Sequence, residues 1–541
     1  MKRSLSDLPK LLLLSVLLAV TGCEKLDLIP ENTFTDASYW TSTEKALTFL
    51  NTAYSQLFTS NHFFYNEGLS DNAYNGRGDN AGAASIASGT YDASLGRIQG
   101  EWDSRYAGIK TCNLFLDNVD RVPDMDEGLR ERVKAEARFI RAWQHFVLMT
   151  WFGDIPLLDS DPSIEEAQTI TRTPRAEVLA FVLSELAAVA EILPNKEEYA
   201  DADRGRVTSG AALAMLARVH LYEGDWSQVV TYTEQLMGGT AGAYALFPSY
   251  PDLFLPANEY SSEDILSIQY VPELRTWGEF FDMAPLSAGA RLNALAPTQE
   301  LVDSYLTRSG LPIDDPASGY DPNDPYANRD PRLAATVVYD GYAWEDIDGT
   351  HTIYIEPGSD PDEPVDEYAP GSSTTPTGYY TRKYFDPTHQ TGLSSGLNLM
   401  LIRYADVLLM YAEAKMELGE FDEGSWNETI RPLRERAGFT DATALTFPAS
   451  FSQAELRELI RNERRIELGM EGLRIFDIRR WRIGEEVLNG WAHGARFGPA
   501  GTDDGYLRVD LRSFDPARHY LWPIPRDERL INDNLSQNPG W

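Results

Sequence analysis

Apolar residues recur every three or four positions over long stretches of the chain, and this spacing predicts amphipathic α-helices. The predicted helices cover residues 42–54, 102–119, 129–151, 175–192, 209–222, 227–237, 298–306, 399–418, 425–437, 453–468 and 472–482. The helix at 129–151 changes from amphipathic to almost wholly apolar, so we expect its C-terminal half to be buried. The pattern as a whole predicts a mostly α-helical protein.

Two regions, 60–97 and 240–395, lack this periodicity except at 298–306 and are rich in turn-forming residues. Short strands are predicted only at 334–339 and 352–355. Loops this long inside a compact chain usually serve a function. We therefore expect a loop-rich lobe that carries a ligand site.

One pattern occurs twice among the helices. Ala217 and Ala412 are each followed after seven residues by a glycine, then by an acidic residue and an aromatic one. In a helix pair the alanine permits close approach and the glycine ends the first helix. The pattern indicates irregular tetratricopeptide-like repeats, over about 98–237 and 398–482.

The N-terminus has the features of a secretory signal. Lys2 and Arg3 precede a ten-residue apolar run at 11–20, which is too short to span a bilayer. Small residues then lead directly to Cys23, as in a bacterial lipobox. We expect residues 1–22 to be a lipoprotein signal peptide, Cys23 to be lipidated, and residues 23–541 to form a single domain. The other cysteine, Cys112, lies in a helical apolar pattern and is expected to be a buried, inert thiol.

Charge and composition exclude several classes of function. Of 541 residues, 83 are acidic and 47 basic, a net charge of −36, which argues against nucleic-acid binding. Seven scattered histidines and the lack of a phosphate-binding loop give no support for a catalytic metal or a cofactor. The Arg-, Glu- and Asp-dense stretch at 461–482 favours structural ion pairs over an anion site.

Aromatic residues within polar loops suggest a surface that binds sugars, because a ring can cover the apolar face of a pyranose while polar neighbours meet its hydroxyls. We expect this ligand site in the loops 65–79 and 275–345. Its candidate residues are Asp71, Asn72, Tyr74, Arg77, Trp277, Tyr342 and Trp344, with Trp277 and Trp344 as stacking platforms. The alternative is that these rings only pin long loops in place.

Several segments, in this order and spacing, are similar to a known family. They include Glu136-Ala-Arg-Phe-Ile-Arg-Ala-Trp143, Trp522-Pro-Ile-Pro525 and Gln537-Asn-Pro-Gly-Trp541, together with 23–30, 112–118, 151–157, 329–333, 404–415 and 461–474. The chain resembles the SusD/RagB family of surface glycan- and nutrient-binding lipoproteins of Bacteroidetes. The resemblance implies four tetratricopeptide-like helix pairs with a loop-rich lobe, and a non-enzymatic protein. It also implies a SusC-like TonB-dependent transporter as partner. Ligand residues vary widely in this family, so the resemblance assigns none here.

These observations predict a lipid-anchored outer-membrane protein, facing the cell exterior, that binds an oligosaccharide and delivers it to the transporter. Three alternatives stay open. The chain could be a secreted lipoprotein glycoside hydrolase, a peptide-binding member of the same family, or an assembly scaffold without a ligand.

Overall fold

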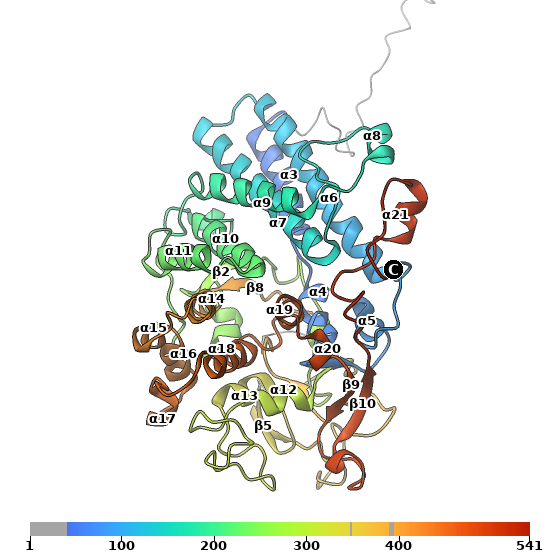
Figure 1. Cartoon of the computed structure of the whole chain (residues 1–541), viewed down its shortest axis with the longest axis vertical. Helices are drawn as coiled ribbons and strands as arrows, with labels where there is room; N and C mark the ends of the chain where they lie inside the picture. The colour runs from blue at the N-terminus through green and yellow to red at the C-terminus, as the bar shows by residue number, and fades with distance from the viewer. Residues whose placement is uncertain (1–39, 347–348, 389–393) are drawn as a thin grey trace, which may run out of the picture.

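The computed structural model describes residues 40–346, 349–388 and 394–541. The predicted signal peptide, residues 1–22, and the predicted lipidation site Cys23 lie outside the described residues. Figure 1 shows packed helices in the upper half of the molecule and a lobe of loops, short helices and hairpins in the lower half. In the part of the chain that the structure describes, no helix is long and apolar enough to cross a membrane.

The longer helices form a continuous array in which each packs on the next: α3 on α6, then α7, α9, α10, α11, α14 and α18. Their bounds are Thr43–Ser55 (α3), Gly96–Asn118 (α6), Glu127–Phe152 (α7), Arg175–Ala190 (α9), Ser209–Glu223 (α10), Trp226–Met237 (α11), Tyr404–Glu417 (α14) and Gln453–Glu467 (α18). The prediction of a mostly α-helical chain is thus confirmed. In α7, Phe139–Met149 is buried throughout, which confirms the burial expected of its C-terminal half.

Shorter helices fill the remaining connections. They are α4 (Ser60–Tyr65), α5 (Ala83–Ala87), α8 (Ile164–Thr169), α12 (Gln299–Ser304), α13 (Pro331–Thr336), α15 (Glu423–Glu428), α16 (Ile430–Ala437), α17 (Ala442–Leu445), α19 (Arg474–Trp481), α20 (Gly484–Val487) and α21 (Arg526–Ile531). Helices α4 and α5 fall inside the region 60–97, which the sequence had indicated to be loop.

Strands pair only in antiparallel twos among the described residues. The pairs are β1 (Ala73–Asn75) with β3 (Leu295–Pro297), β2 (Asp264–Ile268) with β8 (Leu399–Arg403), β4 (Val337–Val338) with β7 (Tyr380–Thr381), β5 (Tyr342–Asp346) with β6 (Gly349–Ile353), and β9 (Gly490–Gly494) with β10 (Leu507–Arg512). The β1–β3 pair sets Tyr74 opposite Ala296 and so ties the two predicted ligand loops together.

Two segments were assigned to the wrong element from the sequence. Residues 399–403 form strand β8 rather than the first turns of a helix, and all five are buried. A short, continuous apolar run fits a buried strand as well as a buried helix, so periodicity could not distinguish them. Residues 334–339 begin within α13, and only Val337–Val338 is strand.

The repeated pattern has the predicted local structure in both copies. Ala217 and Ala412 are fully buried within α10 and α14. Gly224 and Gly419, which follow these helices, have φ angles of +71° and +72°, a backbone conformation that favours glycine. The two segments therefore end their helices in the same way. Cys112 is buried in α6, and burial raises the pKa of its thiol to about 12, as expected of an inert side chain.

Candidate functional site

The two tryptophans predicted to be stacking platforms are buried, and that prediction is wrong. Trp277 is 3% exposed, packs on Phe64, and donates its indole N–H to the Leu397 carbonyl at 2.7 Å. Trp344 is fully buried with its ring against Phe385. Polar neighbours in the sequence made both segments look like surface loops, but each indole fills the interior of the lobe.

Asp71 and Asn72 are also buried, and they fix the structure rather than face a ligand. Asp71 accepts two hydrogen bonds from Arg474, at 2.8 and 2.9 Å, and pairs with Arg465 at 3.0 Å. Burial by itself would raise the pKa of Asp71, but the two arginines outweigh it and hold the pKa well below its ordinary value. Asn72 donates to Glu67 and accepts from Arg465.

The remaining candidates are half-buried. The Tyr342 hydroxyl donates to the Ala334 carbonyl at 2.8 Å, which fixes its ring against α13. Tyr74 lies in β1, and Arg77 lies just beyond it. Arg77 has a buried Nε without a hydrogen-bond partner among the described residues. Tyr74, Arg77 and Tyr342 therefore stay as predicted ligand residues.

An open cleft in the same lobe has the chemistry expected of the site, but it is built from other residues. We call it the lobe cleft, and its volume is about 440 Å³. Its lining residues come from α12, from β9 and from the turn before β10: Gln299, Glu300, Asp303, Trp491, His493, Asp503, Asp504 and Tyr506. Three of them lie within the predicted loop 275–345.

The β9–β10 hairpin gives the lobe cleft its aromatic surface. Successive strand residues face opposite sides, so Trp491 and His493 share one face while Ala492 is buried on the other. Trp491 is 41% exposed. Strand β9 packs against α12, where Glu300 accepts the backbone N–H of His493 at 3.0 Å. A helix and a hairpin thus meet at the cleft, although Glu300 and His493 are 193 positions apart in the sequence.

Charged groups inside the lobe cleft hold one another in place. His493 contacts Glu300 through Nδ1 at 2.8 Å and Asp503 through Nε2 at 3.2 Å. These hydrogen bonds, the one to Glu300 above all, raise the pKa of His493 despite its partial burial. Arg508 donates to Asp503 and, with His493, lowers the pKa of that carboxyl to about 2. Asp303 lies deeper, and burial raises its pKa.

The arrangement combines an exposed indole with a phenol ring and several carboxylate acceptors. Aromatic faces cover the apolar side of a sugar ring, and carboxylates accept hydrogen bonds from its hydroxyls. The sequence contained a usable signal for it, because Trp491 and His493 alternate within a glycine-bounded segment typical of a hairpin. Within the described part of the chain, no group of three or more His, Cys, Asp and Glu side chains is placed to hold a metal ion.

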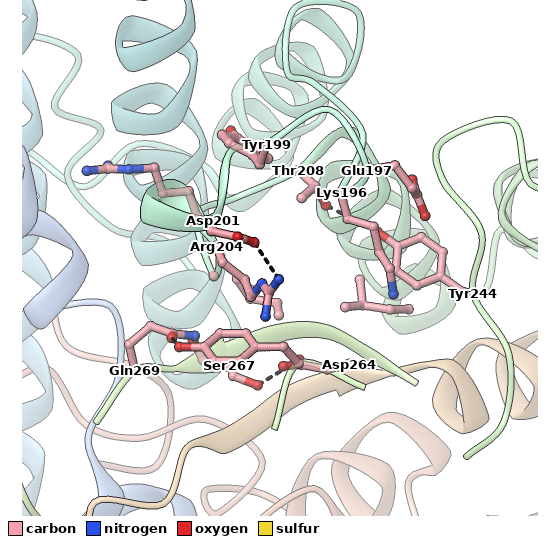
Figure 2. Close-up of a pocket in the computed structure, with 15 residues that line it drawn as sticks. Lys196, Glu197, Tyr199, Asp201, Arg204, Thr208, Tyr244, Asp264, Ser267 and Gln269 are labelled. Carbon is pink, nitrogen blue, oxygen red and sulfur yellow. Dashed lines mark hydrogen bonds and ion pairs between the residues drawn. The ribbon is translucent and has the colours of Figure 1, made fainter. Parts of the chain in front are cut away.

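A second hollow, the polar pocket, lies beside the helical array and is shown in Figure 2. Its volume is about 410 Å³, and it is lined by the loop 196–208, by Tyr244 and Tyr260, and by strand β2 with Gln269. Lys196 and Arg204 both reach into it.

A third hollow, the apolar groove, runs between α6, α8 and α21 and has a volume of about 430 Å³. Ile164 and Ile531 line it and are 80% and 64% exposed, and Leu530 beside them is 75% exposed. Clustered exposed apolar side chains of this kind are typical of a surface that contacts another protein.

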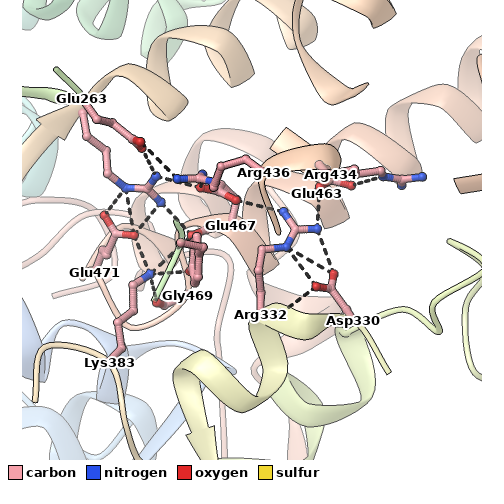
Figure 3. Close-up of polar contacts among 12 residues, drawn as sticks. Glu263, Asp330, Arg332, Lys383, Arg434, Arg436, Glu463, Glu467, Gly469 and Glu471 are labelled. Carbon is pink, nitrogen blue, oxygen red and sulfur yellow. Dashed lines mark hydrogen bonds and ion pairs between the residues drawn. The ribbon is translucent and has the colours of Figure 1, made fainter. Parts of the chain in front are cut away.

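The charged stretch at 461–482 forms structural ion pairs, as predicted. Figure 3 shows part of this buried network of arginines and carboxylates. At its centre Arg403 contacts Glu263, Glu467 and Glu471, each at 2.7 Å. Arg332 bridges Asp330, Glu463 and Glu467. Burial lowers the pKa of Lys383, which pairs with Glu471, to about 8. The charged groups drawn in Figure 3 all pair with one another across α13, α18 and β8, so none of them is left to bind a ligand.

Comparison with known proteins agrees with the fold and with the resemblance seen in the sequence. The SusD family model matches residues 278–541, and a model described as starch-binding, associating with the outer membrane, matches residues 26–221. A SusD-like carbohydrate-binding protein from Bacteroides fragilis, known from a crystal structure, is 31% identical in sequence to this chain. It superposes with a TM-score of 0.82 over 92% of this chain and 100% of that one.

Two curated relatives extend the comparison over the sequence. A SusD-like protein of Formosa agariphila is 28% identical over 98% of this chain and 99% of that protein. The starch-binding protein SusD of Bacteroides thetaiotaomicron is 24% identical over 80% of this chain and 76% of that one. With its helical array, its loop-rich lobe and these relatives, the chain belongs to the SusD family of carbohydrate-binding proteins.

Proposed function

We propose that the protein binds an oligosaccharide in the lobe cleft and delivers it to a SusC-like TonB-dependent transporter of the outer membrane. The observation that carries the binding site is the exposed indole of Trp491 beside Glu300 and Asp303. Relatives described as starch- or carbohydrate-binding support a glycan as the ligand. The chemistry of the cleft supports a sugar with free hydroxyls and does not select one glycan.

Replacement of the indole tests the site. If a sugar covers about 100 Å² of Trp491, burial at about 25 cal/mol per Å² contributes roughly 2.5 kcal/mol. At about 1.4 kcal/mol per tenfold change, Trp491→Ala weakens binding roughly 60-fold. A panel of soluble oligosaccharides is first screened by affinity electrophoresis, and titration calorimetry then measures the Kd of the best ligand.

Phe451→Ala is the matched control, because Phe451 is exposed to a similar degree, 39%, and is not among the residues that line the cleft. We expect its affinity to equal that of the wild type. Equal affinity in Trp491→Ala, with an unchanged melting temperature, would show that the glycan binds elsewhere.

The same panel distinguishes the alternatives. A glycoside hydrolase needs paired carboxylates, and the lobe cleft contains several. New reducing ends that appear with the wild type and disappear with Glu300→Gln would establish a hydrolase instead of a binding protein. Binding of peptides but of no glycan would indicate the peptide-binding alternative. A protein that binds neither is a scaffold.

The anchor is proposed from the sequence alone. Cys23 ends the apolar signal segment, and lipidation there would hold the mature chain on the outer membrane. We expect Cys23→Ala to move the protein from the membrane fraction to the soluble fraction of fractionated cells. A Cys23→Ala protein that still requires detergent would contradict the proposal.

The transporter partner is supported by the family and by the apolar groove, whose Ile164, Leu530 and Ile531 are exposed. We expect the protein to co-purify with a large TonB-dependent transporter after mild solubilisation. The double variant Leu530→Asp and Ile531→Asp should reduce that recovery without changing glycan affinity. Full recovery with this variant would place the contact on another face.

A further inference from the structure

The polar pocket is separate from the lobe cleft, because no element contributes to both. One wall is the connection between α9 and α10, and the opposite wall is strand β2. Gly205 in that connection has a φ of +89°, and a Cβ there would lie 2.6 Å from the side chain of Gln269. The close approach of the two walls therefore depends on a glycine at this position.

Two cations of the connection between α9 and α10, Lys196 and Arg204, reach into the polar pocket, as Figure 2 shows. The Lys196 ammonium lies 4.7 Å from the centre of the Tyr244 ring and donates to the Ser261 carbonyl at 3.3 Å. Among the described residues no carboxylate lies within ion-pair distance of it, and burial lowers its pKa although Asp264 and Glu197 attract its charge from farther away. Arg204 pairs with Asp201 at 2.6 Å, but both side chains are largely exposed, at 58% and 93%, so this pair is weak.

Two other carboxylates of the polar pocket, those of Glu197 and Asp264, accept hydrogen bonds from donors of the protein. Glu197 accepts the backbone N–H of Ala243 at 3.0 Å, and Asp264 accepts the hydroxyl of Ser267 at 2.7 Å. Each carboxylate has further lone pairs that can accept from a ligand hydroxyl. The pocket thus offers cations to an anionic group and acceptors to hydroxyls.

Tyr260, whose ring lines the same pocket, has an unusual backbone conformation. Tyr260 is 37% exposed and has a φ of +56°, which is rare for a residue other than glycine. Its hydroxyl donates to Gln269 at 2.6 Å, and the Arg204 guanidinium lies 5.8 Å from its ring centre. Backbone strain of this kind is concentrated at ligand sites, where the surrounding structure enforces it.

We propose that the polar pocket binds a sugar ring that carries a carboxylate, a hexuronate residue of an anionic glycan. Lys196 and Arg204 would bind the carboxylate, Asp264 and Gln269 the hydroxyls, and Tyr260 the face of the ring. A neutral sugar would leave Lys196 without an ionic partner, and a bare anion would leave most of a 410 Å³ pocket to water. The inference rests on the proposed function only in taking a saccharide as ligand.

The test uses titration calorimetry of the folded protein with an oligoglucuronate and with a neutral glucose oligosaccharide of the same length. The Trp491→Ala background removes stacking in the lobe cleft, so uronate binding that persists there comes from another site. In that background we expect Lys196→Met to weaken uronate binding about tenfold or more, because it removes a charge-assisted hydrogen bond. Arg204→Met should act in the same direction by a smaller factor.

Lys45→Met, which removes an exposed lysine on α3, is the control and should leave both affinities unchanged. Uronate affinity that Lys196→Met does not alter, or that Trp491→Ala abolishes, would overturn the proposal. Acetate or sulfate that binds as tightly as the uronate would overturn the sugar part and leave an anion site. The proposed function fails by a different result, namely that no glycan binds in a manner that depends on Trp491.

Discussion

The buried network around Arg403 and the lobe cleft around Trp491 use the same kinds of residue for different ends. In the network, arginines and carboxylates are almost fully buried and bind one another. In the cleft, an Arg–Asp–His–Glu chain lies at the surface, and its Arg508 lies over the ring of Trp491, an indole that is still 41% exposed. Burial, rather than residue type, therefore decides which charges hold the fold together and which can meet a ligand.

We expect the largest effect from acid, which should disrupt the buried network around Arg403 and lower the melting temperature. Burial raises the pKa values of Glu463, Glu467 and Glu471, but their arginine and lysine neighbours outweigh it and hold them below the ordinary value. Lowered carboxyl pKa values stabilise the fold above the unfolded-state pKa, about 4.3 for Glu, and that stabilisation is lost as the pH falls below it. Melting curves should therefore shift steeply downward between about pH 5 and pH 3. A flat profile over this range would contradict the assignment.

Removal of the central arginine should have the next largest effect. Arg403→Met leaves Glu263, Glu467 and Glu471 buried with fewer partners, and loss of one member of a buried ion pair costs about 3–5 kcal/mol. Urea denaturation monitored by circular dichroism measures the loss. If the variant is as stable as the wild type, the network contributes specificity rather than stability.

The two classes of tryptophan sharpen the comparison further. Trp344→Ala empties a buried site and should lower the free energy of unfolding by about 3–5 kcal/mol, while glycan affinity of the folded fraction stays unchanged. Trp491→Ala should instead lower the glycan affinity and leave the free energy of unfolding unchanged. Loss of affinity in a folded Trp344→Ala protein would restore the original prediction for this residue.

The smallest effect is expected from an ion pair of the lobe cleft. Arg508 and Asp503 are 42% and 30% exposed, and solvent screens pairs of this kind. Arg508→Met should leave the melting temperature unchanged within replicate error. A clear drop would show that the cleft depends on its charges as strongly as the core does.

The helical array could be predicted from the sequence because its signals are local. Residues 209–222 and 227–237 carry apolar side chains at helical spacing, and the structure has α10 and α11 at these places. The strand β8 was not distinguished from a helix, because the apolar run at 399–403 has no period that separates the two.

The site was harder to predict because exposure depends on partners that lie far away in the chain. Trp277 and Trp344 have polar neighbours in sequence, yet their rings are covered by Phe64 and Phe385. Trp491 is exposed because a hairpin directs it away from the buried Ala492. Aromatic residues among carboxylates predict the kind of site, whereas the place of the lobe cleft in the fold depends on tertiary contacts.

The distance in sequence between the two sides of the lobe cleft determines when the site can exist. The cleft forms only when Glu300 contacts His493, which lies 193 residues later in the chain. Contacts this remote form late in folding, after the local helices. A chain that ends at α19 therefore has much of its helical array but no lobe cleft, so the proposed ligand site depends on completion of the chain.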